Sequence, residues 1–441
     1  MKMKINYIVV LFIMALSVHA QESMTLPKAI SMGLEKNYQI KVDDKFILIA
    51  ENNDTWARAG KLPTIDLTAN FSNTVTQDNN PASFLKGEYY NGSLNGNVAA
   101  NWVVFAGGRV QIVKDQLGIS VDQQRLNKLT GVHELMRNIY QDYYDVLFQQ
   151  ERLIVLESSL SLSKNRLAYE ETKRSFGASN SFNLIQFENA VLSDSINLVN
   201  QIQQVEISKR NLYNTLNIIG YANYTFPERL AIINEQIDIA SLKKVLSEEN
   251  YTLKSLEMIA SLNRLNTKLE KTDMLPTISV NASVGAAENG FKIFADNPMT
   301  GEPYDLLFSN RLNGSIGASA SWRLFDGGVR KADIANAQIQ EDIDQINIVE
   351  AQATLGNQLD ILVDNHENQL QILSLSDEQI KIAERNLEIT EERFKGGQIS
   401  SIDFRNVQNQ YLTAAFSKVN AIYSLILTKS EIDFLVGTFS E

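Results

Sequence analysis

Cysteine is absent from this chain of 441 residues, and histidine occurs only three times. Without cysteine the chain can form no disulfide, no thiolate metal site, no cysteine nucleophile and no lipid-bearing cysteine. His19 lies near the N-terminus, and the other two histidines, His133 and His366, are far apart in the sequence. We therefore expect no metal, no cofactor and no catalytic residue.

Long apolar segments are also missing from most of the chain. An apolar run from Ile5 to Leu16 follows Lys2 and Lys4 and precedes Val18-His19-Ala20. A basic start, a short apolar run and a small-x-Ala ending are typical of a signal peptide. We predict that residues 1–20 are this signal peptide. No later stretch approaches the roughly 20 apolar residues that a membrane helix needs.

Positive charge is in deficit, because the formal net charge is −12. An acidic surface argues against a nucleic-acid partner. Neighbouring acids occur at Glu170-Glu171 and Glu391-Glu392, and paired carboxylates could serve a hydrolase. We interpret both pairs as solvated helix faces, so the sequence gives an enzyme no support.

The chain does contain a repeated pattern. The segment 101–108, Asn-Trp-Val-Val-Phe-Ala-Gly-Gly, returns 220 residues later as Ser-Trp-Arg-Leu-Phe-Asp-Gly-Gly. Further pairs are Asn37-Tyr38 with Asn250-Tyr251, Leu62-Pro63 with Leu275-Pro276, and Gly177 with Gly397. Such self-similarity indicates a duplication. We predict a first repeat at 21–230, a second at 231–441 and an equatorial linker at 218–240. Each repeat should contain a helix, a β-hairpin, a long helix and a short helix.

Apolar and polar residues alternate in two segments of each repeat, which indicates β-strands. In the first segment Ile65, Leu67, Ala69 and Phe71 occupy one face. We predict β-hairpins at 64–105 and 277–325. Alternation alone leaves open a soluble β-sandwich. The predicted strands, however, exceed the usual length of about 5 or 6 residues, and they suit a tilted membrane crossing of about 9 to 11.

Aromatic residues lie near both ends of the predicted strands, as in the interfacial girdles of a membrane barrel. Four strands cannot close a barrel, for which about eight is the smallest number. The bilayer also tolerates no unpaired strand edge. We therefore predict a mixed α and β membrane protein, whose internally duplicated protomer shares one barrel with other copies.

Two proline-free segments, at about 108–176 and 328–395, are predicted to be long helices. At about 1.5 Å per residue, each would extend about 100 Å. In the second, apolar residues recur every seven positions, which is typical of the seam of a coiled coil. This seam consists of Leu359, His366, Leu373, Ile380, Leu387 and Phe394. We interpret His366 as a packed, hydrogen-bonded residue rather than a metal ligand.

Glycine should end each long helix in a left-handed C-cap, after which a serine or asparagine starts the next helix. We predict these returning helices at about 181–217 and 401–436. Shorter helices are predicted at about 26–60 and 241–273, before the hairpins. They should end where Pro63 and Pro276 exclude helical geometry from the preceding residue.

The strands should return to helix at glycine pairs beside a tryptophan. These turns are Trp102 with Gly107 and Gly108, and Trp322 with Gly327 and Gly328. We expect these two turns, together with Pro63 and Pro276, to mark the membrane boundary.

The order and duplicated spacing of these motifs resemble the TolC-like outer-membrane efflux protein family. The resemblance covers nearly all of the chain after residue 20. It implies a homotrimer in outer-membrane lipid, with a shared 12-stranded β-barrel continued by a long α-helical periplasmic barrel. It also implies docking to a periplasmic adaptor and, through it, to an inner-membrane transporter. The docking residues would lie at the helix tips: Gly177, Ser181, Gly397 and Ser401.

The resemblance further implies a periplasmic gate lined by acidic residues. Alignment on Gly397 places Asp403 at the family's first aspartate and Asn406 at its second. Phe394 and Ile399 replace the tyrosine and the arginine of a latch that some members have. In the first repeat, Asn183 occupies the place of Asp403. A carboxylate in the first turn of a helix is also favoured by the helix dipole, so that alternative stays open for Asp403.

The predicted function is therefore an outer-membrane channel that exports small molecules as the exit duct of a tripartite efflux pump. Two alternatives remain open. One is the exit duct of a type I protein or polysaccharide secretion system. The other is a periplasmic coiled-coil structural protein that forms no channel.

Overall fold

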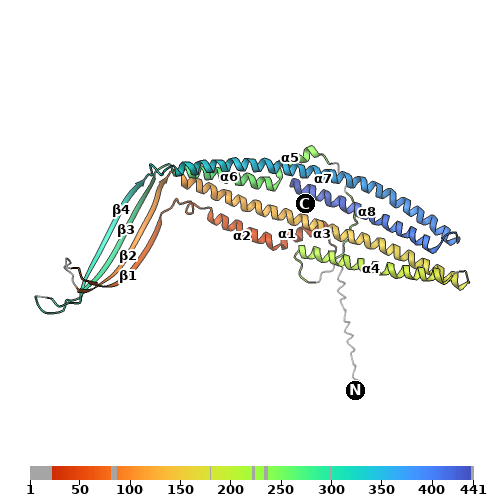
Figure 1. Cartoon of the computed structure of the whole chain (residues 1–441), viewed down its shortest axis with the longest axis horizontal. Helices are drawn as coiled ribbons and strands as arrows, with labels where there is room; N and C mark the ends of the chain where they lie inside the picture. The colour runs from red at the N-terminus through yellow and green to blue at the C-terminus, as the bar shows by residue number, and fades with distance from the viewer. Residues whose placement is uncertain are drawn as a thin grey trace, which may run out of the picture. The chain divides into compact units, whose positions relative to one another are not determined.

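The computed structural model describes residues 22–80, 87–178, 180–220, 224–232, 237–297 and 299–438. The predicted signal peptide, 1–20, and part of the predicted linker, 218–240, lie outside these described residues. Figure 1 shows the helices and the four-stranded sheet. Among the described helices, none is long and apolar enough to cross a membrane.

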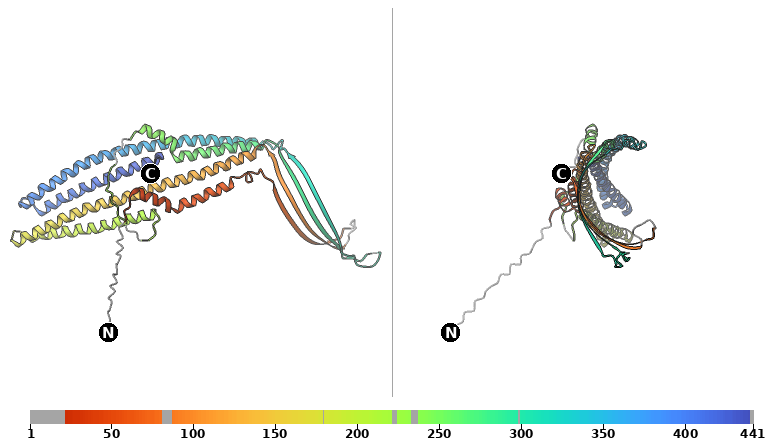
Figure 2. Two further views of the ribbon diagram at one scale, coloured as in Figure 1. Left: turned by 180° about the vertical axis from the view of Figure 1, so that it is seen from behind. Right: turned by 90° about the vertical axis from the view of Figure 1, so that its left-hand side faces the viewer.

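The strands form one antiparallel sheet in the order β1-β2-β3-β4, which Figure 2 shows to be curved. Its members are β1 (Thr64–Asp78), β2 (Gly87–Ala106), β3 (Thr277–Ile293) and β4 (Leu307–Ser321). The register pairs like with like, as in Thr68 opposite Asn97 and Val98 opposite Val284. One polar and one apolar face result. The described residues form this single sheet, so the sandwich alternative is wrong. β4 ends at Ser321, four residues before the predicted end of the hairpin.

Two helices of 67 residues follow the hairpins, namely α3 (Arg109–Ser175) and α7 (Val329–Lys395). Their returning partners are α4 (Ser181–Thr215) and α8 (Ser401–Val436), which run beside them in Figures 1 and 2. The predicted seam of α7 is buried from Leu359 to Phe394, apart from the half-buried Leu387. His366 is packed in this seam. Its Nδ1, however, has no hydrogen-bond partner among the described residues, contrary to our expectation.

The prediction of one continuous helix at 26–60 and one at 241–273 was wrong, because each of these segments contains two helices. The first divides into α1 (Leu26–Lys36) and α2 (Tyr38–Asn53), and the second into α5 (Ile239–Glu249) and α6 (Tyr251–Thr272). Asn37 and Asn250 stand at the breaks with extended backbone, at ψ 128° and 126°. The Asn37 Oδ1 accepts a hydrogen bond from the Ile40 N–H (3.0 Å), and so caps α2. The repeated Asn-Tyr pair therefore marks a break in both copies.

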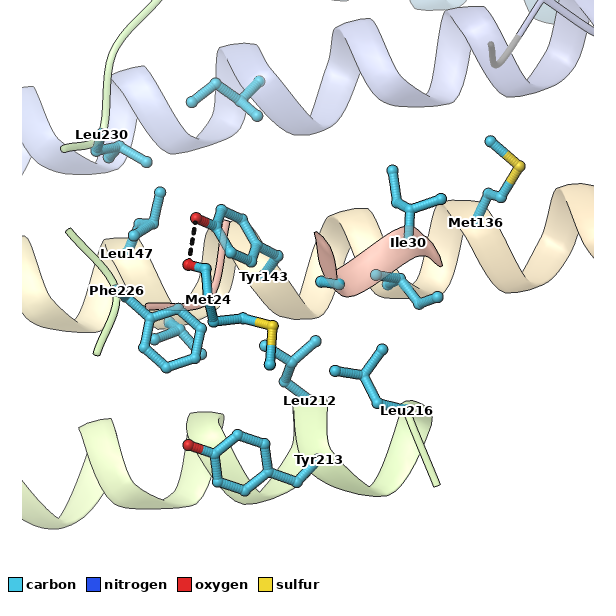
Figure 3. Packing of buried hydrophobic residues seen from close by; sticks show 14 of the residues in the cluster. Met24, Ile30, Met136, Tyr143, Leu147, Leu212, Tyr213, Leu216, Phe226 and Leu230 are labelled. Atoms are coloured by element: carbon cyan, nitrogen blue, oxygen red, sulfur yellow. Dashed lines mark hydrogen bonds between the residues drawn. The ribbon is translucent and has the colours of Figure 1, made fainter. Parts of the chain in front are cut away.

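The chain divides into two compact units, which cut across the predicted repeats. One unit contains 1–41, 129–250 and 353–441, and the other contains 42–128 and 251–352 with the whole sheet. The first unit has its main core where α1, α3, α4 and the residues after α4 meet (Figure 3). There the buried Tyr143 hydroxyl donates to the Met24 carbonyl oxygen (3.2 Å) and to Glu228 (2.8 Å).

Candidate functional site

Both helix turns in the first unit have the predicted backbone. Gly177 ends the α3 side at φ 71°, and Gly397 ends the α7 side at φ 70°. A left-handed φ of this kind favours glycine over residues with a Cβ. The Asn180 side chain then caps α4 by accepting from the Asn183 N–H (2.9 Å). Ser400 caps α8 in the same way, by accepting from the Asp403 N–H (3.1 Å).

Asp403 completes a capping box at the start of α8. Its Oδ2 accepts from the Ser400 N–H (3.2 Å) and from the Ser400 hydroxyl (2.7 Å). In this motif the Ser400 and Asp403 N–H groups, which have no partner within the helix, each donate to the side chain of the other residue. Asp403 is exposed, as is Asn406 one turn later. The carboxylate therefore has a structural role within the chain, and its exposed position leaves a pore-lining role open.

Asn183 and Ser401 join the two turns. The Ser401 hydroxyl donates to the Asn183 Oδ1 (3.0 Å). Ser401 is 2% exposed, whereas Ser181, its counterpart in the first turn, is exposed. Of the two serines predicted to dock a partner, only Ser181 presents its side chain at the surface of the chain.

Phe394 packs in an aromatic cluster between the turns. Its ring centroid lies 5.5 Å from that of Phe187 on α4 and 5.4 Å from that of Phe404 on α8. Tyr169 on α3 adds a fourth ring at 6.4 Å. Ile399 packs against the same cluster. The two helix pairs are thus held together by aromatic packing close to both turns.

A buried charged group, which the sequence reasoning missed, lies next to this cluster. Arg405 on α8 contacts both carboxylate oxygens of Asp194 on α4, one of them at 2.9 Å. Ser163 on α3 donates to the Asp194 Oδ2 (2.6 Å), and the Gln408 amide donates to the Ser163 hydroxyl (2.8 Å). We call Asp194, Arg405, Ser163 and Gln408 the tip clasp. It ties α3, α4 and α8 together.

A sequence signal for the tip clasp did exist. Phe187, Ala190, Asp194, Gln201 and Val205 are all buried on α4, with the three- to seven-residue spacing of a packing seam. An aspartate at a seam position is costly to bury unless it is paired. The spacing could therefore have predicted a basic partner for Asp194, but not which one.

A second ion pair links α3 to α7. Arg166 contacts Glu391, and the Lys395 ammonium lies 2.9 Å from the same carboxylate. Burial raises the pKa of Glu391, but hydrogen bonds from Lys395 and Arg166 outweigh it, so that the pKa is held below its usual value. Glu170 is 1% exposed. The interpretation of Glu170 as solvated was therefore wrong, and Glu391 is an ion-paired residue.

The predicted boundary turns, in the second unit, show the same contact in both copies. The Trp102 indole N–H donates to the Lys61 carbonyl oxygen (2.9 Å), and the Trp322 indole N–H donates to the Met274 carbonyl oxygen (3.0 Å). Each carbonyl belongs to the residue two positions before the proline, Pro63 or Pro276. The tryptophan therefore fastens the end of one strand to the entrance of the hairpin.

The glycine pairs of these turns all have left-handed φ: Gly107 at 62°, Gly108 at 87°, Gly327 at 74° and Gly328 at 93°. At Gly107, an added Cβ would also lie 2.9 Å from the Thr272 carbonyl oxygen. Both the conformation and the close approach therefore require glycine there.

The second boundary turn carries an extra ionic contact. Asp326 accepts from the Gly328 N–H (3.0 Å) and from the Arg330 Nε (2.6 Å). The hydrogen bond from Arg330 lowers the pKa of the Asp326 carboxyl. The first copy has Ala106 at the position of Asp326. This turn is therefore more strongly fixed in the second copy.

Among the described residues, no group of three or more histidine and acidic side chains could hold a metal ion. Arg405 is paired with Asp194, and Arg330 with Asp326. Arg166 and Lys395 are both paired with Glu391. Their geometry is that of a packed helical assembly joined to a two-faced sheet.

Comparisons with known proteins agree with this geometry. The model of the family described as outer membrane efflux protein matches residues 34–217 and 243–438. No curated protein sequence matches the chain.

Several solved structures share the fold at low sequence identity. A membrane protein from Pseudomonas aeruginosa is 14% identical, with a TM-score of 0.76, over 95% of this chain and 91% of that one. The Campylobacter jejuni CmeC outer membrane channel is 16% identical, with a TM-score of 0.74, over 94% and 86%. The open state of the Neisseria gonorrhoeae MtrE outer membrane channel is 15% identical, with a TM-score of 0.71, over 93% and 88%.

The family model matches far more than half of the chain, in two segments that each lie within one of the predicted repeats. This match excludes the alternative of a structural protein that forms no channel. The chain belongs to the outer membrane efflux protein family, and it is an outer-membrane channel protein with a helical part in the periplasm.

Proposed function

We propose that three copies of this chain form the exit duct of a tripartite efflux pump. Each copy would give its four strands to a 12-stranded barrel. The observation that carries this proposal is the open sheet, whose edge strands β1 and β4 have no further strand beside them among the described residues. A bilayer tolerates no such edge. If several copies join edge to edge, β4 of each copy pairs with β1 of the next, and no unpaired edge remains.

The two faces of the sheet support a water-filled passage. One face carries hydroxyl and amide side chains, among them Ser72 hydrogen-bonded to Ser93 and Ser283 hydrogen-bonded to Ser315. The other carries exposed apolar residues such as Ile65, Leu67 and Phe71. In a barrel the apolar face would contact lipid, and the polar face would line the lumen. Export would then need no bond chemistry from this chain.

We infer that the periplasmic end closes at the two helix turns. Asp403 would place a carboxylate from each copy around the neck and favour cations there. The adaptor would dock at the exposed turns, near Gly177, Ser181 and Gly397, and couple the duct to an inner-membrane transporter. Adaptor binding opens the neck only if the adaptor contacts the open arrangement better than the closed one.

The tip clasp supports a specific form of this movement. It joins the α3/α4 pair to the α7/α8 pair inside one copy. Removing one partner of a buried ion pair costs about 3–5 kcal/mol. Opening would therefore either move the four helices of a copy together or require the adaptor to displace the clasp.

The test combines mass and conductance. The purified protein should have the mass of three chains in detergent and should form channels in a planar bilayer. Replacing Asp403 with alanine should raise the conductance and weaken block by divalent cations. A monomeric mass without channels would contradict the duct. Unchanged conductance and block in Asp403→Ala would contradict only the role of Asp403 in the gate.

Loss of the gene should make the host more sensitive to toxic small molecules. Unchanged sensitivity together with loss of a secreted protein or polysaccharide would replace efflux by secretion.

A further inference from the structure

The polar face of the sheet is almost free of charge. Within the strands, charged residues on this face occur at three positions: Asp66 and Asp78 on β1, and Arg311 on β4. The remaining charged strand residues, Glu88, Glu288 and Lys292, alternate onto the apolar face. All three polar-face charges therefore lie on the two edge strands, with acids on one edge and a base on the other.

Arg311 has no acidic neighbour in its own sheet. The hydrogen-bonded row that contains it runs from Asn70 through Asn95 and Ala287 to Arg311, and the other three members are uncharged. No ion pair involves Arg311 among the described residues. The acids of β1 are three strands away, about 14 Å at the usual strand spacing of about 4.8 Å.

A second copy changes this, because its β1 would lie directly beside β4. β1 and β4 run in opposite directions, since three antiparallel steps separate them. Joining β4 to the next copy's β1 therefore continues the antiparallel pattern. The basic edge of one copy then meets the acidic edge of the next, at the distance of neighbouring strands.

Two contacts show on which side of β1 the sheet continues. The Asn97 carbonyl oxygen accepts from the Thr68 hydroxyl (3.4 Å) and so faces β1, whereas the Glu88 carbonyl oxygen accepts from the Phe294 N–H (2.8 Å) and so faces β3. Backbone groups point to alternate sides along a strand. For L-residues this arrangement places β2 to the left of β1, when the apolar face is viewed with β1 pointing upward.

The twist of sheets makes barrel strands rise to the right in that view, at about 35–45° to the axis. The hydrogen-bonded rows, which are perpendicular to the strands, therefore climb to the left, from β1 to β4 and into the next copy. Four strand spacings of about 4.8 Å correspond to a shift of about 13–19 Å along the strand, or about four to six residues. Arg311 is level with Asn70 in its own copy. It should therefore face Thr74 or Thr76 of the next copy.

We propose that Arg311 forms an ion pair with Asp78 of the next copy, and that three such pairs help to close the barrel. Where Thr76 faces Arg311, Asp78 is the next polar-face residue along β1, and a residue on this diagonal is within reach of a long side chain. Asp66 lies in the opposite direction along β1, much farther away. This inference rests on the proposed trimer, whose own test is the mass in detergent.

The first experiment uses the absence of cysteine, because any introduced pair is then the only one. Arg311→Cys with Asp78→Cys, treated with a short bismaleimide in outer membranes, should give covalent dimers and trimers. The matched control is Arg311→Cys with Asp66→Cys, which should give none. Cross-linking of the Asp66 pair alone would overturn the proposed register.

The second experiment tests the charge itself. Arg311→Asp and Asp78→Arg should each lower the dissociation temperature of the detergent-purified trimer, because like charges would then face each other across each of the three seams. The double variant should recover most of that loss, whereas Arg311→Asp with Asp66→Arg should recover none.

The two hypotheses fail in different ways. A wild-type protein that is not trimeric contradicts the proposed function. A trimeric wild-type protein whose double variant shows no recovery contradicts only the ion pair.

Discussion

The two helix turns occupy corresponding places in the predicted repeats, and they differ in chemistry while sharing one backbone. Both end a long helix on a left-handed glycine and start the next on a side-chain cap. At equivalent places, however, the first turn has Phe176, 82% exposed, and the second has Gly396. Ile185, 59% exposed in the first, corresponds to Arg405, which is bound to the buried Asp194 in the second. Backbone geometry is therefore shared, whereas the arginine that contacts Asp194 is present only in the second turn.

The largest expected effect comes from breaking the tip clasp. Arg405→Ala should lower the free energy of unfolding by about 3–5 kcal/mol, because Asp194 is left buried without its partner. The matched control is Ile185→Ala, at the equivalent exposed position, which should change it by less than about 0.5 kcal/mol. Thermal unfolding followed by circular dichroism measures both.

A double variant separates the lost ion pair from lost packing. Arg405→Ala with Asp194→Ala should be less destabilised than Arg405→Ala alone, because no charge remains buried. Equal losses in Arg405→Ala and Ile185→Ala would show that the two turns do not differ as described.

The long helices offer a second comparison. His366 on α7 corresponds to the fully buried Val146 on α3. Burial lowers the pKa of His366, with the Lys429 charge as a further cause. Below about pH 6.5, His366 therefore binds a proton more readily in the unfolded chain than in the folded chain. The free energy of unfolding should then fall as the pH falls, by at most about 1.4 kcal/mol per pH unit.

His366→Val makes the second helix resemble the first and should remove this part of the acid dependence. Melting temperatures measured from pH 7.5 to pH 5 give the slope for both proteins. A slope unchanged by His366→Val would mean that other groups cause the acid sensitivity.

A smaller effect is expected at the capping box. Asp403→Asn makes the second turn resemble the first, which has Asn183, and should cost about 1 kcal/mol or less. Asn183→Asp, the reverse change, should have little effect on stability, since a carboxylate also suits the first turn of a helix. A large loss of stability in Asp403→Asn would contradict the capping geometry.

The periodic parts of the fold could be predicted from the sequence. The alternation of apolar residues predicted four strands, and both 67-residue helices lie where the proline-free segments placed them. The breaks at Asn37 and Asn250 were missed, because an asparagine inside an otherwise helical pattern is only weakly unfavourable. Here the side chain of each asparagine forms hydrogen bonds at the break in the helix. One of them runs from the Asn250 side-chain amide to the Leu435 carbonyl oxygen (2.8 Å).

The site was predicted less completely than the fold. Gly177 and Gly397 could be predicted, because helix ends have local signals. The partnership of Asp194 and Arg405 could not, because the two residues are separated by 211 positions and meet only through packing of α4 on α8. Phe394 was recognised as a seam residue, but its neighbours Phe187 and Phe404 were identified only in three dimensions.

The central claim is that the chain forms a channel whose helix turns, joined by the tip clasp, control its opening. Single-channel conductance in planar bilayers tests it most directly, with wild type, Arg405→Ala and Ile185→Ala compared in one buffer. We expect trimeric channels in all three, with conductance raised in Arg405→Ala and unchanged in Ile185→Ala. Equal conductance in wild type and Arg405→Ala, with both proteins folded and trimeric, would contradict control by the clasp.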